Sequence, residues 1–165
     1  MSCEITTRNS KYFSDVMESV SNILQIGNIN IKRDGLYVSG MDEMHISLIN
    51  LELNSGDFEK YEFNPGENDS IQLGINFTEF VKLLKVSSGH DYLTIRYNSS
   101  EPKLNIIFSN DGLIRKYSLM LLDTDTNDIN VPSIDYYLEL ELSTKLFTNI
   151  VNSVIATGAE EITFK

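Results

Sequence analysis

Three amphipathic helix patterns recur along this chain at an almost constant spacing. In each, apolar residues return at positions i, i+3, i+4 and i+7, the period of a helix with one buried face. The predicted helices cover residues 10–24, 76–86 and 143–155. Each begins at a residue suited to N-capping, and these residues, Ser10, Asn76 and Ser143, are 66 and 67 positions apart. Such a spacing indicates that one supersecondary unit occurs more than once.

Strand patterns surround each helix pattern in the same order. A glycine follows each helix pattern, at Gly27, Gly89 and Gly158, where we expect a left-handed helix end. Runs rich in β-branched and aromatic residues predict strands at 4–8, 28–32, 35–40, 45–53, 58–63, 70–75, 92–97, 104–108, 114–122, 135–142 and 161–165. The repeating unit is therefore a strand, a helix and then three strands.

The turns between these strands favour antiparallel pairing. Arg33–Gly35 and Asn54–Asp57 have the short Gly, Asp and Asn composition of hairpin turns. Two units then form one α+β domain, with antiparallel sheets outside and a pair of helices on one face. The 165 residues hold about two and a half units of 66. We therefore expect a domain of two units at 1–121, a connector at 122–134, and the incomplete start of a second domain at 135–165.

Composition limits the possible functions. The net charge of −11 argues against a protein that binds nucleic acid over its whole surface, but it leaves a local basic face open. The single cysteine, Cys3, allows no disulfide and no zinc cluster within the chain. No apolar run approaches the ~18 residues of a membrane span, so no membrane partner is expected.

The predicted connector, LDTDTNDINVPSID, raises the question of a calcium site. Asp123, Asp125 and Asn127 alternate like ligands, but an EF-hand loop needs glycine at position six and glutamate at position twelve. Those positions hold Asp128 and Ile134. We therefore expect a solvated acidic linker and no bound metal.

Apolar residues occur at two places where polar ones are expected, one in the acidic connector and one on the outer face of a strand. Ile129 and Val131 would point to the same side of an extended connector, and Pro132 stiffens the segment after them. In the predicted strand 45–53, Ile49, Leu51 and Leu53 alternate toward the core, whereas Ile46 and Leu48 share the opposite face with polar Asn50 and Glu52. Met41 and Met44 precede them.

These patterns leave two interpretations open. The connector covers Ile46 and Leu48, or it lies beside them and forms a groove for an apolar peptide.

No catalytic constellation is predicted. The two histidines, His45 and His90, have no cysteine or metal-ligand partner at a suitable spacing, and no phosphate-binding or hydrolase motif occurs. Asp42 has no partner carboxylate or base in the pattern, and we interpret it as a structural turn residue. We expect neither enzymatic activity nor a cofactor.

The stretch GLYVSGMDEMHISLINLEL resembles the G-[VL]-x-[VL]-x-[SA]-M-D-x-x-H-[VI]-[SA]-L stretch of eukaryotic-type sliding clamps, the proliferating cell nuclear antigen family. Met41, Asp42, His45 and Leu48 carry this resemblance at the family's spacing. It continues collinearly through INFTEFVKLLK, KYSLMLLDTD and the Ile-x-Val-Pro of the connector.

The resemblance implies a processivity factor. In that family three subunits close head to tail into a ring around duplex DNA, with helices lining the channel. DNA polymerase, flap endonuclease, ligase and the clamp loader dock through short motifs. The location would be the nucleus, or a viral replication site.

The resemblance assigns the family's functional roles to the matching positions of this sequence. The implied partner groove consists of Met41, His45, Ile46, Leu48, Ile129, Val131 and Pro132. The implied DNA-facing residues are Lys11, Lys82, Lys85 and Lys145. The implied subunit interface is the edge strand at about 113–121, here Leu113, Ile114, Arg115, Lys116 and Tyr117. Its partner edge would lie beyond Lys165, so this chain is not expected to close a homotrimeric ring by itself.

The chain departs from the family in one respect, because its helices carry fewer basic residues. This weakens phosphate contact but not encirclement. Two alternatives stay open: a checkpoint-type or monomeric viral clamp-like factor, and a β-rich interaction module that does not bind DNA.

Overall fold

The structure, a computed structural model, describes residues 1–87, 91–124, 135, 138–159, 161 and 163. The chain divides into two compact units, Met1–Ile129 and Asn130–Lys165.

Two repeats build the first unit. The predicted order of a strand, a helix and three strands holds for the second repeat, whereas the first has four strands after its helix. The first repeat contains β1 (Ser2–Thr7), α1 (Ser10–Ser21), β2 (Ile26–Ile31), β3 (Gly35–Met41), β4 (Leu48–Asn54), the short 3-10 helix η1 (Ser55–Asp57) and β5 (Lys60–Asn64). The second contains β6 (Ile71–Asn76), α2 (Phe77–Leu84), β7 (Tyr92–Asn98), β8 (Lys103–Asn110) and β9 (Leu113–Met120). Helix α3 (Thr144–Thr157) belongs to the second unit.

The strands form two antiparallel sheets, in the orders β5-β1-β7-β8-β9 and β4-β3-β2-β6. Each repeat places its first strand in the other repeat's sheet: β1 pairs with β7 through Ile5↔Ile95, and β6 pairs with β2 through Ile29↔Leu73. The predicted α+β fold with antiparallel sheets is confirmed.

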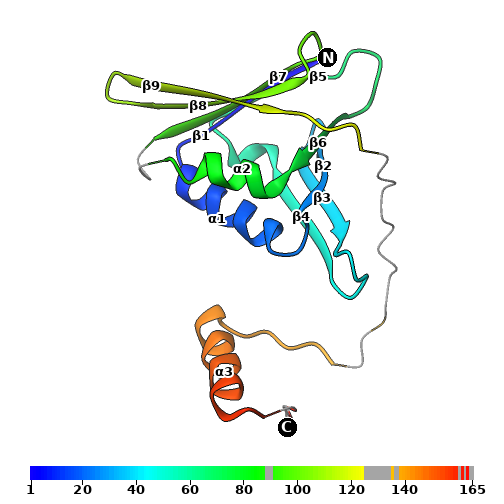
Figure 1. Ribbon diagram of the computed structural model, residues 1–165, viewed down its shortest axis with the longest axis vertical. Coiled ribbons are helices and arrows are strands. Elements are labelled where there is room, and N and C mark those ends of the chain that lie inside the picture. The colour runs from blue at the N-terminus through cyan, green and yellow to red at the C-terminus, as the bar shows by residue number, and fades with distance from the viewer. Residues whose placement is uncertain (88–90, 125–134, 136–137, 160, 162, 164–165) are drawn as a thin grey trace. The chain divides into compact units, whose positions relative to one another are not determined.

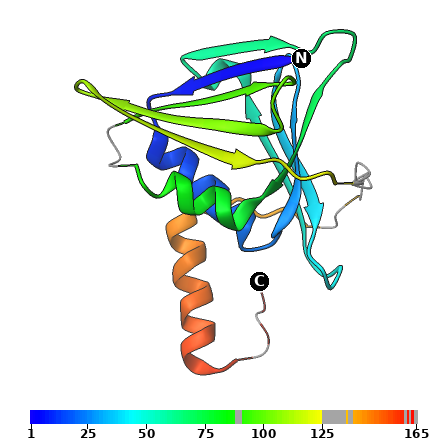
Figure 2. The same cartoon turned by 45° about the horizontal axis from the view of Figure 1, so that its top comes forward.

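The helices α1 and α2 lie side by side and cover the sheets from one side (Figures 1 and 2). Phe13 of α1 meets Phe80 of α2 edge to face, with ring centroids 6.4 Å apart, an arrangement that aromatic pairs favour. Met17, Phe77 and Leu84 are almost fully buried beside them. The apolar faces predicted from the helical period therefore form the centre of the core.

The helix starts agree with prediction in two cases of three. The side chain of Asn76 accepts a hydrogen bond from the Glu79 amide, and that of Ser143 accepts one from the Leu146 amide. In α1, however, the cap is Asn9 rather than Ser10. Ser10 is buried, and its hydroxyl oxygen lies 2.8 Å from that of Ser87, so it joins the helix to the loop after α2.

The three predicted helix-ending glycines have different outcomes. Gly158 ends α3 in the left-handed region, with φ of 64°, as expected. Gly27 does not end α1, which stops at Ser21, but lies within β2. A Cβ at Gly27 would meet the Leu24 side chain at 2.6 Å, so this glycine leaves room for a core leucine. Gly89 lies outside the described residues.

Three strand predictions need correction. The strand predicted at 45–53 begins at Leu48, because residues 42–47 form a hydrogen-bonded turn. Asn54–Asp57 is not a hairpin turn, since β4 and β5 belong to different sheets. Residues 138–142 are described but are not in a strand, because no described strand pairs with them. Of 161–165, only 161 and 163 are described.

Candidate functional site

The turn between β3 and β4 is held by one carboxylate. Asp42 Oδ1 accepts hydrogen bonds from the amides of Ser47, at 2.6 Å, and Ile46, at 2.8 Å. These bonds, that from Ser47 first, hold the pKa of Asp42 below its ordinary value. His45 has φ of 55°, the left-handed conformation that closes the turn. Asp42 thus has the structural role predicted for it.

This turn presents an exposed apolar surface. Ile46 is 75% exposed and Leu48 is 39% exposed, and Met44 beside them is also exposed. On the other face of β4, Ile49, Leu51 and Leu53 pack against the core. The two-faced interpretation of this strand is confirmed, although Ile46 lies in the turn and not in the strand.

A pocket of about 460 Å³ lies beside the turn. Its walls are residues 41–45 on one side and residues 23–26, from the loop after α1 to the start of β2, on the other. Ile26, half exposed, is a wall residue that the sequence interpretation missed. Its only signal was an apolar side chain between a helix and a glycine.

The connector is described only at its start. The Leu122 amide donates a 2.9 Å hydrogen bond to the Gly74 carbonyl of β6, and the Thr124 hydroxyl donates one to Asn28 Oδ1. The predicted groove residues Ile129, Val131 and Pro132 lie outside the described residues. Asp125 and Asn127, which were considered above as calcium ligands, lie outside them as well. Among described residues, no group of three or more His, Cys, Asp and Glu side chains could hold a metal ion.

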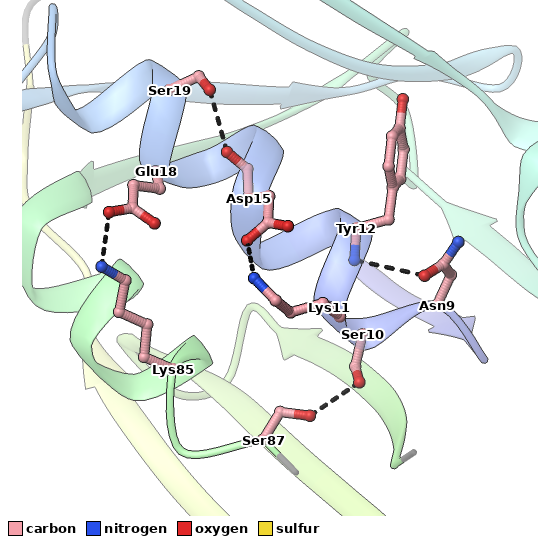
Figure 3. A network of polar contacts seen from close by, with 9 residues as sticks. All are labelled: Asn9, Ser10, Lys11, Tyr12, Asp15, Glu18, Ser19, Lys85 and Ser87. Atoms are coloured by element: carbon pink, nitrogen blue, oxygen red, sulfur yellow. Dashed lines mark hydrogen bonds and ion pairs between the residues drawn. The ribbon is translucent and has the colours of Figure 1, made fainter. Parts of the chain in front are cut away.

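On the polar faces of α1 and α2, basic side chains are paired with acidic ones. Lys11 pairs with Asp15, Lys82 with Glu79 and Lys85 with Glu18, the last two at 2.6 Å. Figure 3 shows the Lys11 and Lys85 pairs on neighbouring helices. Each predicted DNA-facing lysine of the first unit is therefore beside a carboxylate. Lys145 is exposed on α3 of the second unit.

The sequence interpretation did not predict these ion pairs. The Lys11–Asp15 and Glu79–Lys82 spacings, four and three residues, are readable as helix pairs. The Glu18–Lys85 pair joins residues 67 positions apart, so no local pattern reveals it.

The edge strand β9 has described ladder contacts to β8 along its length. Of the five predicted interface side chains, two face their own unit. The Arg115 guanidinium donates to the Val86 carbonyl and to Asp91, and the Tyr117 ring packs on Phe108, with centroids 6.2 Å apart. The other three, Leu113, Ile114 and Lys116, are exposed.

In the part of the chain that the structure describes, no helix has both the length and the apolar character needed to cross a membrane.

Comparisons with known proteins agree with this architecture. Residues 3–128 match the family described as proliferating cell nuclear antigen, N-terminal domain. The chain is 24% identical over 164 residues to "Proliferating cell nuclear antigen" of Chaetomium thermophilum, covering 98% of this chain and 61% of that protein. It is 28% identical over 154 residues to "DNA polymerase sliding clamp" of Cenarchaeum symbiosum, covering 93% of this chain and 59% of that protein. For "Proliferating cell nuclear antigen 2" of Drosophila melanogaster the identity is 28% over 137 residues, covering 82% of this chain and 52% of that protein. The chain thus spans between half and two thirds of these relatives.

Proposed function

Because this chain belongs to the family of the proliferating cell nuclear antigen N-terminal domain, we propose that it works as part of a DNA sliding clamp. Such a clamp is a polymerase processivity factor that encircles duplex DNA as a ring. The chain supplies the first clamp domain at 1–121, the connector at 122–134 and the start of the second domain at 135–165. No catalytic step is assigned to it. Its place of action is the nucleus, or a viral replication site.

One observation carries this proposal: the family match covers the whole two-repeat unit. The match begins in β1 and extends past β9, over both sheets and both helices. The edge strand β9 offers backbone groups for pairing with another subunit. A homotrimer assembled through this edge would leave Leu113, Ile114 and Lys116 in the interface, with Arg115 and Tyr117 supporting the strand from behind.

Partner docking is assigned to the turn surface. We assign this docking surface to Met41, His45, Ile46 and Leu48 at the turn, together with Ile129, Val131 and Pro132 of the connector. DNA polymerase, flap endonuclease, ligase and the clamp loader would bind here through short motifs. Burial of two or three apolar side chains provides roughly 1.5–3 kcal/mol each before ordering costs. This magnitude suits micromolar affinity and rapid exchange of partners.

The helix faces support encirclement rather than tight DNA contact. Lys11, Lys82 and Lys85 are each beside a carboxylate, so few charges remain to displace counterions from phosphate. A topological ring needs little affinity for the duplex that it surrounds.

A labelled peptide tests the docking assignment. The peptide is a short motif with apolar and aromatic side chains from a DNA polymerase partner, and a scrambled peptide serves as control. Fluorescence anisotropy should give a micromolar Kd, and Leu48→Ser should weaken binding at least tenfold. Ile114→Ser is the control, because Ile114 is also an exposed aliphatic residue, 62% exposed against 39% for Leu48, but lies on β9. Equal weakening by both variants, or no effect of Leu48→Ser, would contradict the assignment.

A further inference from the structure

The start of the connector contacts a particular place on the four-stranded sheet. After β9, the Leu121 amide still donates to the Pro102 carbonyl, at 3.1 Å. One residue later, the Leu122 amide donates to the Gly74 carbonyl of β6, and Gly74 and Leu122 form an antiparallel bridge. The chain therefore passes from one sheet to the edge of the other within two residues.

Gly74 is the residue that allows this contact. A Cβ at this position would lie far inside van der Waals distance of the Leu122 carbonyl oxygen, and 2.8 Å from Thr124 Oγ1. Real Cβ atoms essentially never approach heavy atoms below 3.0 Å. The nearest obstacle is backbone, which has no rotamer to change. Any side chain at position 74 must therefore displace the connector or the strand.

A polar pair with one buried member lies directly beside this glycine. Asn28 is the cross-strand partner of Gly74 and is 4% exposed. Its Oδ1 accepts the hydrogen bond from the Thr124 hydroxyl, whereas its Nδ2 has no hydrogen-bond partner among the described residues. A buried amide satisfied on one side contributes little to stability. It does specify which connector residue lies above it, because an aliphatic residue in place of Thr124 would leave the Asn28 oxygen without this donor.

We propose that Gly74, Asn28 and Thr124 are positioning residues that fix the register of the connector's first residues on β6. A slip of one residue at this anchor would place another residue over Asn28. Ile129, Val131 and Pro132, which are assigned above to the docking surface, follow this anchor in the sequence. Displacement of the anchor should therefore weaken peptide binding. This inference rests on the proposed docking function, but its first readout does not depend on that function.

Amide exchange measured by NMR provides the first readout. In Gly74→Ala, the Leu122 amide should lose its protection and exchange at least tenfold faster, while the Ile29 amide in the sheet keeps its rate. Gly56→Ala is the matched control, because a Cβ there meets nothing within 4 Å. Unchanged exchange at Leu122 in Gly74→Ala would overturn the proposal.

Peptide binding provides the second readout. Gly74→Ala and Thr124→Val should each weaken the labelled polymerase peptide at least fivefold. Thr124→Ser, which retains the hydroxyl, should restore binding. Faster exchange at Leu122 with undiminished peptide binding would overturn the proposal, because the register would then not matter for docking. If the unmodified chain binds no peptide, the docking function fails, and the exchange result still decides whether Gly74 holds the connector.

Discussion

Nζ of Lys85, at the end of α2, lies 2.6 Å from Oε1 of Glu18 on α1. This ion pair connects the two helices across their polar faces, at side chains that are each about half exposed. Exposed pairs of this kind add little to stability. Their main effect is on charge, because the carboxylate neutralises a lysine that is proposed to face DNA.

Removal of that carboxylate should increase DNA binding. In Glu18→Gln, Lys85 becomes available to phosphate, so affinity for duplex DNA should rise at low salt. The slope of log K against log salt concentration should steepen by about 0.9 for one added phosphate contact. Fluorescence anisotropy with a labelled duplex over a salt series measures both quantities.

Glu62→Gln is the control for this experiment, because it removes the same charge from a sheet residue paired with Lys60. If both variants change the slope equally, the effect is one of net charge, and the helix face is not where DNA lies.

The turn after β3 should loosen in acid. The folded pKa of Asp42 is depressed by the Ser47 and Ile46 amides, so its contribution is present above the ordinary pKa of about 3.9. That contribution is lost as pH falls through the depressed folded value. The Ile46 and Ser47 amide shifts in NMR spectra should move together in this acid range. In Asp42→Ala these amides should show no such transition, and a transition that persists would assign it to another carboxyl group.

The two faces of β4 should respond differently to substitution. Ile46→Ser and Leu48→Ser remove exposed apolar groups and should change the free energy of unfolding by less than about 0.5 kcal/mol. Leu51→Ser removes a side chain that packs on the core and should cost about 2 kcal/mol or more. Urea unfolding followed by circular dichroism measures all three. A Leu48→Ser variant as unstable as Leu51→Ser would identify Leu48 as an ordinary core residue.

Cys3 should be chemically inert in the folded protein. Its side chain is 3% exposed, and desolvation raises its pKa to about 11, although a backbone hydrogen bond from Tyr97 opposes the shift. Near pH 8 the thiolate, which is the reactive form, is a small minority. Ellman's reagent should therefore label Cys3 only as fast as the protein opens. Labelling should reach the rate of a free thiol in denaturant, and rapid labelling without denaturant would show that β1 is not stably paired.

Periodicity was enough to predict the repeats, the helix faces and the apolar surface near Leu48. These features depend on side chains within a few positions of one another, such as Phe13 and Met17 or Ile49 and Leu51. The α1 cap was misassigned because Asn9 and Ser10 are adjacent and both suited to capping. Only the burial of Ser10 against Ser87 distinguishes them.

Long-range contacts set the limit of sequence interpretation. Nothing near Gly74 indicates that Leu122 will cross it, and nothing near Lys85 indicates Glu18. The role of Gly27 was misread for a local reason: α1 already ends at Ser21, so Gly27 lies in β2 beside the Leu24 side chain and not at a helix end. Arg115 and Tyr117, which are proposed interface residues, face inward because strand alternation places them on the core side of β9.

The exchange of first strands between the repeats has a consequence for synthesis. Strand β1 pairs with β5 and β7, and its register with β7 joins residues about 90 positions apart, such as Ile5 and Ile95. A nascent chain leaving the ribosome must therefore hold β1 without its second neighbour until β7 has emerged. Contacts of such long range slow folding. Either half of the unit expressed alone would expose sheet edges that its missing half normally covers.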